Sequence, residues 1–269
     1  MNSIVWIASY PKSGNTWVRF LACNLLFGRQ ESASGLNALA PDVHELLAAG
    51  GAGSAGDSTT SEPHGLLKTH FALSAALPHR DRTRAALYVV RDPADVLVSN
   101  FFYSRRSSAS GDTSVQAFDG YVEEFIAQRG DPRWAALGMG SWEDNVKSWR
   151  SGTEFPVEVL RYEDMLADPL TAARRMAALI RPEAGEREIE AAVSDSSFDR
   201  MREIEREDIR MRRVGIFYKP YLEASIAAGN RFMRRGVAGD GALRLRPEQR
   251  ARLYAALGPL TRDLGYETA

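Results

Sequence analysis

The chain has 269 residues, 44% of them hydrophobic and 26% charged, which excludes a disordered or fibrous protein and fits one folded domain. Lysine and arginine number 34 against 35 acidic residues, so the net positive charge typical of nonspecific nucleic-acid binding is absent. The single cysteine, Cys23, excludes an internal disulfide and a cysteine-rich metal site, and we expect it to be a packed, inert thiol.

Apolar stretches in the sequence are short. None approaches the roughly twenty residues that a membrane helix needs, and the opening run is too short for a signal peptide. We therefore expect a cytoplasmic protein whose partners include neither a membrane nor nucleic acid.

The chain opens with a continuous apolar run over residues 4–8, which predicts a strand buried on both faces of a parallel sheet. From Asn15, apolar residues recur at helical spacing as far as Gly28, a typical helix C-terminal glycine. Further strands are predicted at 65–69, 85–90 and 157–160, and further helices at 94–104, 115–127, 142–149, 172–180 and 247–264. The alternation predicts an α/β fold with a central, mainly parallel sheet flanked by helices.

We expect a single domain over residues 1–269 that includes three mobile segments. A stretch of Gly, Ala, Ser and Thr at 50–63 shows no periodicity, which is typical of a surface loop. The other two segments, 103–138 and 206–230, lie between the motifs described below. The densely charged stretch 200–218 predicts a solvated helix followed by a lid, with a direct role in substrate binding as the alternative.

Residues 9–17 join the first strand to the first helix and have the sequence Ser-Tyr-Pro-Lys-Ser-Gly-Asn-Thr-Trp. Ligands of α/β proteins bind at such junctions, where free N–H groups and the positive end of the helix dipole stabilise an anion. Lys12 adds a cation and Gly14 allows close approach of the backbone, so the loop predicts a phosphate site. It differs from the usual P-loop because the lysine comes early, and a purely structural turn is the alternative.

Two arginine segments add candidates for a second phosphate site. Arg91 ends a predicted strand and Ser99 follows eight positions later, so the two could bracket a phosphate. The alternative is that Arg91 pairs with Asp95. Arg234 and the residues after it, Arg-Gly, form a late basic run, which on its own is usually a solvated face.

Six segments, in this order, resemble the motifs of sulfotransferases that use 3′-phosphoadenosine 5′-phosphosulfate (PAPS). They are residues 9–17, Leu67-Lys68-Thr69-His70, residues 91–99, Gly140-Ser141-Trp142, Arg161 to Met165, and Phe232 to Gly236 with Gly239-Asp240. The chain departs from the family pattern at Asn15 (usually Thr), Phe71-Ala72 (often Leu-Pro), Arg235 (often Lys) and Gly241 (usually Trp). The resemblance implies the P-loop nucleotide-kinase-like fold of this family, with PAPS as donor and adenosine 3′,5′-bisphosphate (PAP) as product.

The resemblance also implies roles for individual residues. Donor contacts fall to Lys12, Ser13, Gly14, Asn15, Thr16 and Trp17 at the 5′-phosphosulfate, to Arg91, Ser99, Arg234, Arg235 and Gly236 around the 3′-phosphate, and to Trp17 and Tyr162 at adenine. His70 is the implied general base, since histidine titrates near neutrality. Lys12 would stabilise the bridging oxygen, Lys68 the transferred group, and Ser99 would hold Lys12 in the resting enzyme.

The other histidines, His44, His64 and His79, are interpreted as structural or exposed, and no metal is expected. The opening sequence Trp-Ile-Ala-Ser-Tyr-Pro-Lys resembles small bacterial members that modify natural products such as glycopeptide antibiotics, which favours a small-molecule, phenolic acceptor. A sugar hydroxyl on a glycan or glycolipid is the alternative. A kinase-like nucleotide phosphotransferase and a catalytically silent nucleotide-binding scaffold are the rival classes, and a homodimer is common in the family.

Overall fold

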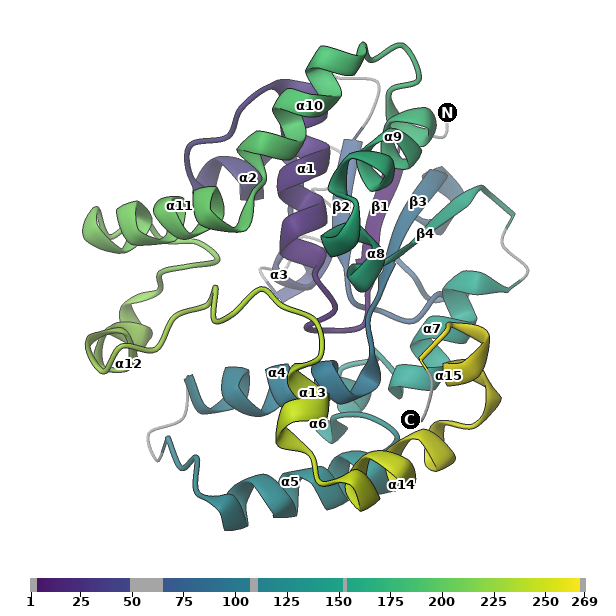
Figure 1. Cartoon of the computed structure of the whole chain (residues 1–269). Helices are drawn as coiled ribbons and strands as arrows, with labels where there is room; N and C mark the ends of the chain where they lie inside the picture. The colour runs from purple at the N-terminus through teal and green to yellow at the C-terminus, as the bar shows by residue number, and fades with distance from the viewer. Residues whose placement is uncertain (1–3, 49–64, 107–110, 152–153, 267–269) are drawn as a thin grey trace.

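The computed structural model describes residues 4–48, 65–106, 111–151 and 154–266. Four parallel strands form its sheet in the order β2-β1-β3-β4 (Figure 1). Their bounds are β1 (Ile4–Ser9), β2 (Gly65–Thr69), β3 (Thr83–Val90) and β4 (Val157–Arg161). Each lies within two residues of a predicted strand, so the predicted parallel sheet is confirmed.

Helices cover both faces of the sheet because side chains of a strand point alternately to opposite sides. Val5 and Ile7 face a layer formed by α1 (Asn15–Phe27), α9 (Pro169–Ile180), α10 (Glu186–Asp195) and α11 (Phe198–Arg210). Trp6 and Ala8 face the opposite layer, formed by α4 (Pro93–Arg106), α5 (Val115–Gln128), α7 (Trp142–Arg150) and α14 (Pro247–Leu257). The two faces therefore carry separate hydrophobic clusters with the sheet between them.

Shorter helices connect these layers. They are α2 (Ala33–Leu39), α3 (Val43–Ala48), α6 (Pro132–Ala136), α8 (Tyr162–Ala167), α12 (Glu223–Ala227), α13 (Asp240–Arg244), α15 (Pro259–Asp263) and the 3₁₀ turns η1 (Arg80–Arg82) and η2 (Pro220–Leu222). The expected loop 50–63 lies outside the described residues. The segments 103–138 and 206–230 both contain helices, with Tyr121 and Phe125 of α5 buried in the core, and their mobility stays a prediction.

The single helix expected over 247–264 is wrong at one point. Gly258 has φ 66 and ψ −152, a backbone conformation that ends α14, and Pro259 begins α15. Proline suits a first helical position because that position needs no N–H donor, and glycine adopts positive φ without strain. The apolar spacing continues across the break, which is why periodicity alone predicted one helix.

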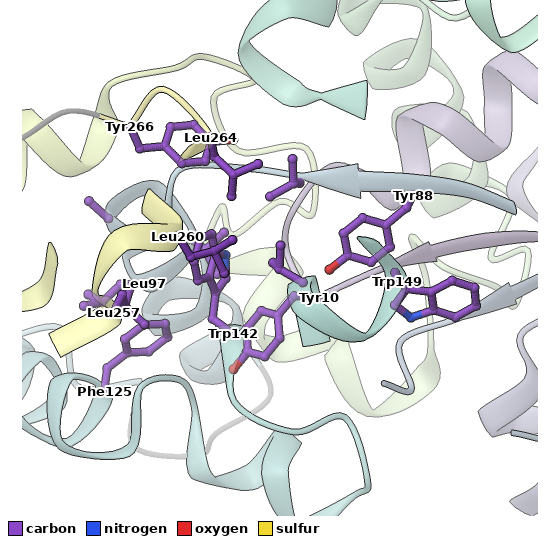
Figure 2. Packing of buried hydrophobic residues seen from close by; sticks show 14 of the residues in the cluster. Tyr10, Tyr88, Leu97, Phe125, Trp142, Trp149, Leu257, Leu260, Leu264 and Tyr266 are labelled. Atoms are coloured by element: carbon purple, nitrogen blue, oxygen red, sulfur yellow. The ribbon is translucent and has the colours of Figure 1, made fainter. Parts of the chain in front are cut away.

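The hydrophobic core beside the sheet also contains a chain of hydrogen-bonded polar groups that ends at His70. Figure 2 shows Tyr88 of β3 beside Trp149 of α7, and their rings stack with centroids 6.0 Å apart. The Tyr88 hydroxyl donates to Asn145 Oδ1 at 2.8 Å, and Asn145 Nδ2 donates to the His70 carbonyl at 2.9 Å. Buried packing therefore fixes the main chain that carries the expected base.

The contact between α13 and α4 accounts for the glycine where related sequences usually have tryptophan. The amide of Gly241 donates to Asp95 Oδ1 at 2.7 Å, and the Gly239 amide to Asp95 Oδ2 at 3.0 Å. A Cβ at Gly241 would lie 2.5 Å from the main-chain carbonyl carbon of Ala94, closer than side chains come. Only glycine lets the two backbones approach in this way.

We expect Gly241→Ala to lower the free energy of unfolding by about 1–3 kcal/mol, because the added methyl overpacks against α4. Gly120→Ala is the matched control: Gly120 is exposed in α5 with open space around it, so alanine there should stabilise by about 0.5–1 kcal/mol. Denaturant titration of both variants measures these changes. Equal effects of the two substitutions would contradict the packing interpretation.

Candidate active site

A cavity of about 680 Å³ opens at the carboxyl edge of the sheet. Figure 1 shows the loop between β1 and α1 at the same edge as the start of α4. The volume of the cavity is in the range of small-molecule binding sites. Among the site residues expected from the sequence, all but Ser13 line it: Lys12, Gly14, Asn15, Thr16, Trp17, Lys68, His70, Arg91, Ser99, Tyr162, Arg234, Arg235 and Gly236. Ser13 is fully buried.

The loop before α1 has the backbone shape of an anion-binding turn. Lys12 and Gly14 have positive φ, 70 and 110. A Cβ on Gly14 would lie 2.6 Å from Cδ2 of Tyr162, so this glycine is required by both conformation and space. No side chain caps α1, which leaves its first N–H groups available to an anion.

Lys12 extends from this loop between two aromatic rings. Its Nζ lies 3.9 Å from the ring centroid of Tyr103 and 4.5 Å from that of Phe232, which are cation–π contacts. Burial, followed by the nearby arginines, with Arg106 foremost, lowers the pKa of Lys12 to about 7. In the described part of the chain Lys12 has this aromatic contact and no hydrogen bond to Ser99, so the restraint by Ser99 stays a prediction.

Arg91 makes the ion pair that the sequence left open as an alternative. Its guanidinium contacts Asp95 Oδ2 at 3.0 Å, donates to the Val237 carbonyl at 2.8 Å, and lies 4.3 Å from the centroid of the Tyr162 ring. Its buried Nε has no hydrogen-bond partner among the described residues. Arg91 therefore lines the cavity and pairs with Asp95, while its buried Nε has a donor to spare.

The late arginines gather around one buried carboxylate. Asp240 forms ion pairs with Arg234, with Arg235 at 2.6 Å and with Arg244 at 3.3 Å. Burial raises the pKa of Asp240, but the three arginines, Arg234 foremost, hold it below its usual value. One carboxylate thus orients several guanidinium groups without neutralising them, which leaves local positive charge for an anion.

Aromatic rings also line the cavity next to the loop and Arg91. The rings of Trp17 and Tyr162 meet edge to face, with centroids 5.8 Å apart. Phe198 also lines the cavity, and a Cβ on Gly236 would come within 2.3 Å of its ring. Sequence analysis missed Phe198 because a phenylalanine at a helix start carries no distinguishing signal.

Hydrogen bonds fix the orientation of His70 on three sides. Its Nδ1 lies 2.8 Å from the Ser9 carbonyl, which can only accept, so Nδ1 carries the proton and Nε2 is free to act as a base. The His70 amide donates to His44 Nε2 at 3.2 Å, and Asn145 donates to the His70 carbonyl. Burial, then the Lys68 ammonium, holds the pKa of His70 well below its usual value, so the ring is neutral near pH 7.

Lys68 has a carboxylate partner that sequence analysis missed. Its Nζ contacts Asp42 Oδ2 at 2.6 Å, with both side chains mostly buried. Burial raises the pKa of Asp42, but Lys68 and His70 lower it to about 2. Burial also lowers the pKa of Lys68 despite this partner. Asp42 and His44 precede β2 by more than 20 residues, and no motif marks them.

Comparison with known proteins places the chain in a family. Residues 2–265 match the model of the sulfotransferase domain. Sulfotransferase 1A1 of Bos taurus is 29% identical over 251 residues, covering 87% of this chain and 75% of that protein. Sulfotransferase 1B1 of Canis lupus familiaris is 25% identical over 240 residues, with the same coverage.

Two solved structures share the fold. Mouse sulfotransferase SULT7A1 complexed with PAP superposes with a TM-score of 0.66 at 20% identity and covers 98% of this chain and 86% of that one. Retinol dehydratase in complex with androsterone and inactive cofactor PAP has a TM-score of 0.64 at 19% identity, with 97% and 81% covered.

The fold and the family match define a transferase of the P-loop-like sulfotransferase class. The chain belongs to the sulfotransferase family. The resemblance found in its six motifs is confirmed, as is the prediction of a PAPS-dependent sulfotransferase.

Among the described residues, no helix is long and apolar enough to cross a membrane. In the same ranges, no group of three or more His, Cys, Asp or Glu side chains is arranged to hold a metal ion.

Binding of PAP should be accompanied by proton uptake at Lys12. With a pKa of about 7 the free lysine is mostly neutral at about pH 8, and phosphates beside it favour its charged form, so we expect uptake of close to one proton. Calorimetry in buffers of different ionisation enthalpy measures this. Lys12→Met should abolish the uptake, and buffer-independent heats for the unmodified protein would contradict the assignment.

Proposed function

We propose that this sulfotransferase transfers the sulfuryl group of PAPS to the hydroxyl of a small aromatic molecule, such as a phenolic natural product. The observation that carries the acceptor class is the set of aromatic and apolar side chains in the cavity lining, among them Tyr103, Trp134 and Phe232. Retinol dehydratase, which has the same fold, was solved with androsterone and PAP. A cytoplasmic location, a bacterial natural-product pathway and a homodimer stay predictions.

We assign the donor to the half of the cavity that contains the loop before α1. The free amides of the loop and Lys12 would take the 5′-phosphosulfate, and the guanidinium groups of Arg91 and Arg234 the 3′-phosphate. Trp17 and Tyr162 would contact adenine. The side chains around this loop support the assignment, because more of them are cationic than anionic and they include the aromatic rings of Trp17 and Tyr162.

The proposed reaction is an in-line displacement at sulfur. The acceptor hydroxyl gives its proton to His70 Nε2 as its oxygen bonds to sulfur, and the bond from sulfur to the bridging phosphate oxygen breaks. Lys12 stabilises the negative charge that develops on that bridging oxygen, and Lys68 that on the transferred group. PAP leaves with the bonding electron pair, and His70 later releases its proton to solvent.

The acceptor half of the cavity supports an aromatic substrate more than a sugar. Its lining includes Tyr103, Trp134, Leu137, Met139, Ile216 and Phe232. Met139 lies close to the base, since Asn145 Nδ2 donates to both the Met139 carbonyl at 2.7 Å and the His70 carbonyl. A carbohydrate would bring many hydroxyl groups that apolar side chains leave without hydrogen bonds.

His70→Ala should reduce kcat at least about a hundredfold, the scale of a lost general base, and leave the affinity for PAP within about twofold. Arg91→Ala should weaken PAP binding, since the guanidinium is expected at the 3′-phosphate. Calorimetry with PAP and AMP, together with transfer of radiolabelled sulfate, measures both effects. The unmodified protein should prefer PAP to AMP; without that preference the donor assignment is wrong.

The acceptor class can be tested with two panels. Incubation with PAPS and either phenols or mono- and disaccharides, followed by mass spectrometry for an added sulfate, should yield products chiefly from the phenols, because the lining is mainly aromatic and apolar. His70→Ala provides the blank for each panel. Efficient sulfation of the sugars alone would favour the carbohydrate alternative.

A further inference from the structure

The end of β2 is bordered by a short segment, residues 41–44, that no motif of the chain identifies. The Lys68 amide donates to the Pro41 carbonyl at 2.8 Å, and Asp42 pairs with Lys68 as an isolated parallel bridge. Asp42 therefore lies along the outer edge of β2 as a single bridge residue, directly before α3 begins at Val43. The bridge places Asp42 beside Lys68, and the first turn of α3 places His44 beside the His70 amide.

The side chains of Asp42 and His44 contact different partners. Asp42 Oδ2 accepts from Lys68 Nζ at 2.6 Å, and its Oδ1 accepts from the His44 amide at 3.0 Å. His44 Nε2 accepts from the His70 amide at 3.2 Å. The carboxylate thus fixes both the ammonium of Lys68 and the main chain of His44, and His44 in turn holds the main chain of the base.

The hydrogen bond to the His70 amide determines the state of His44. An N–H donor requires an unprotonated acceptor, so Nε2 carries the lone pair and Nδ1 the proton. His44 therefore cannot take a proton at Nε2 without losing its bond to His70, although it lines the same cavity. Its ring is also held in place, with its centroid 3.9 Å from that of Phe71.

Burial and the Lys68 ammonium favour this neutral form. Asp42 precedes His44 and Glu45 follows it in α3, and Lys68 of β2 and His70, directly after β2, face it. Burial, then Lys68, lowers the pKa of His44 to about 4, with Asp42 opposing. The acceptor bond to the His70 amide is therefore present near neutral pH.

We propose that His44, held by Asp42, is a positioning residue for this sulfotransferase: it fixes the main chain of His70 so that Nε2 points at the acceptor hydroxyl. The proposal rests on the proposed role of His70 as general base. A geometry error of about 1 Å can cost up to about a hundredfold in rate, so loss of this bond should affect turnover more than donor binding.

The test uses the full chain with 2-naphthol as phenolic acceptor. His44→Ala should lower kcat about tenfold and leave the KM for PAPS and the affinity for PAP unchanged. His44→Gln, whose side-chain oxygen can accept from the His70 amide, should recover kcat to within about threefold of the unmodified enzyme. Leu47→Ala, an exposed position on the same helix, is the control for α3 and should retain full kcat.

A second measurement distinguishes a positioning role of His44 from loss of folding, and it does not require turnover. Nitrogen NMR of 15N-histidine-labelled protein should show His70 as a single Nδ1–H tautomer in the unmodified chain and in His44→Gln, and as mixed tautomers in His44→Ala. The acid limb of kcat should move to higher pH in His44→Ala, because water beside His70 relieves the burial that lowers its pKa.

Unchanged kcat and an unchanged His70 tautomer in His44→Ala would overturn the proposal, as would equal damage from alanine and glutamine. Failure of the proposed function gives a different result, since the unmodified enzyme would then neither bind PAP nor sulfate 2-naphthol. The NMR comparison still decides the position of His70 in that case.

Discussion

Cations buried at the carboxyl edge of the sheet, with too few carboxylates to match them, impose the main constraint on this molecule. Lys12 lies among arginines, and two carboxylates, Asp95 and Asp240, are their buried partners. Burying like charges is costly, so the lysine responds by a lowered pKa and contacts aromatic faces. A ligand with several phosphate charges relieves the same repulsion. The repulsion that destabilises the ligand-free protein therefore favours binding of such a ligand.

The two carboxylates do more than balance charge. Asp95 accepts amide hydrogens from Gly239 and Gly241 and so joins α13 to the start of α4, which brings Arg234 to the cavity that Arg91 already lines. The backbone contact that requires glycine at 241 is part of this arrangement. The site therefore depends on a contact between residues 146 positions apart in the sequence, Asp95 in the first turn of α4 and Gly241 in α13.

The sequence predicted what local patterns encode. Apolar runs located the four strands, helical spacing located the main helices, and the residue types of 9–17 located the loop between β1 and α1. These signals succeed because they depend only on neighbours in the chain. The break at Gly258 was missed because apolar periodicity continues across it. Asp42 and His44 were missed because Asp42 meets β2 through a single bridge and His44 meets His70 from the first turn of α3, contacts that no local pattern records.

The departure from the family pattern at Asn15 also has a structural counterpart. Asn15 Nδ2 donates to the Ile7 carbonyl at 3.1 Å and to Ser9 Oγ at 3.2 Å, and that hydroxyl lies 3.2 Å from His70 Nδ1. A threonine has no second donor to make both bonds. The amide thus links the first turn of α1 to Ser9, which also contacts His70, so the loop before α1 and His70 share one hydrogen-bond network.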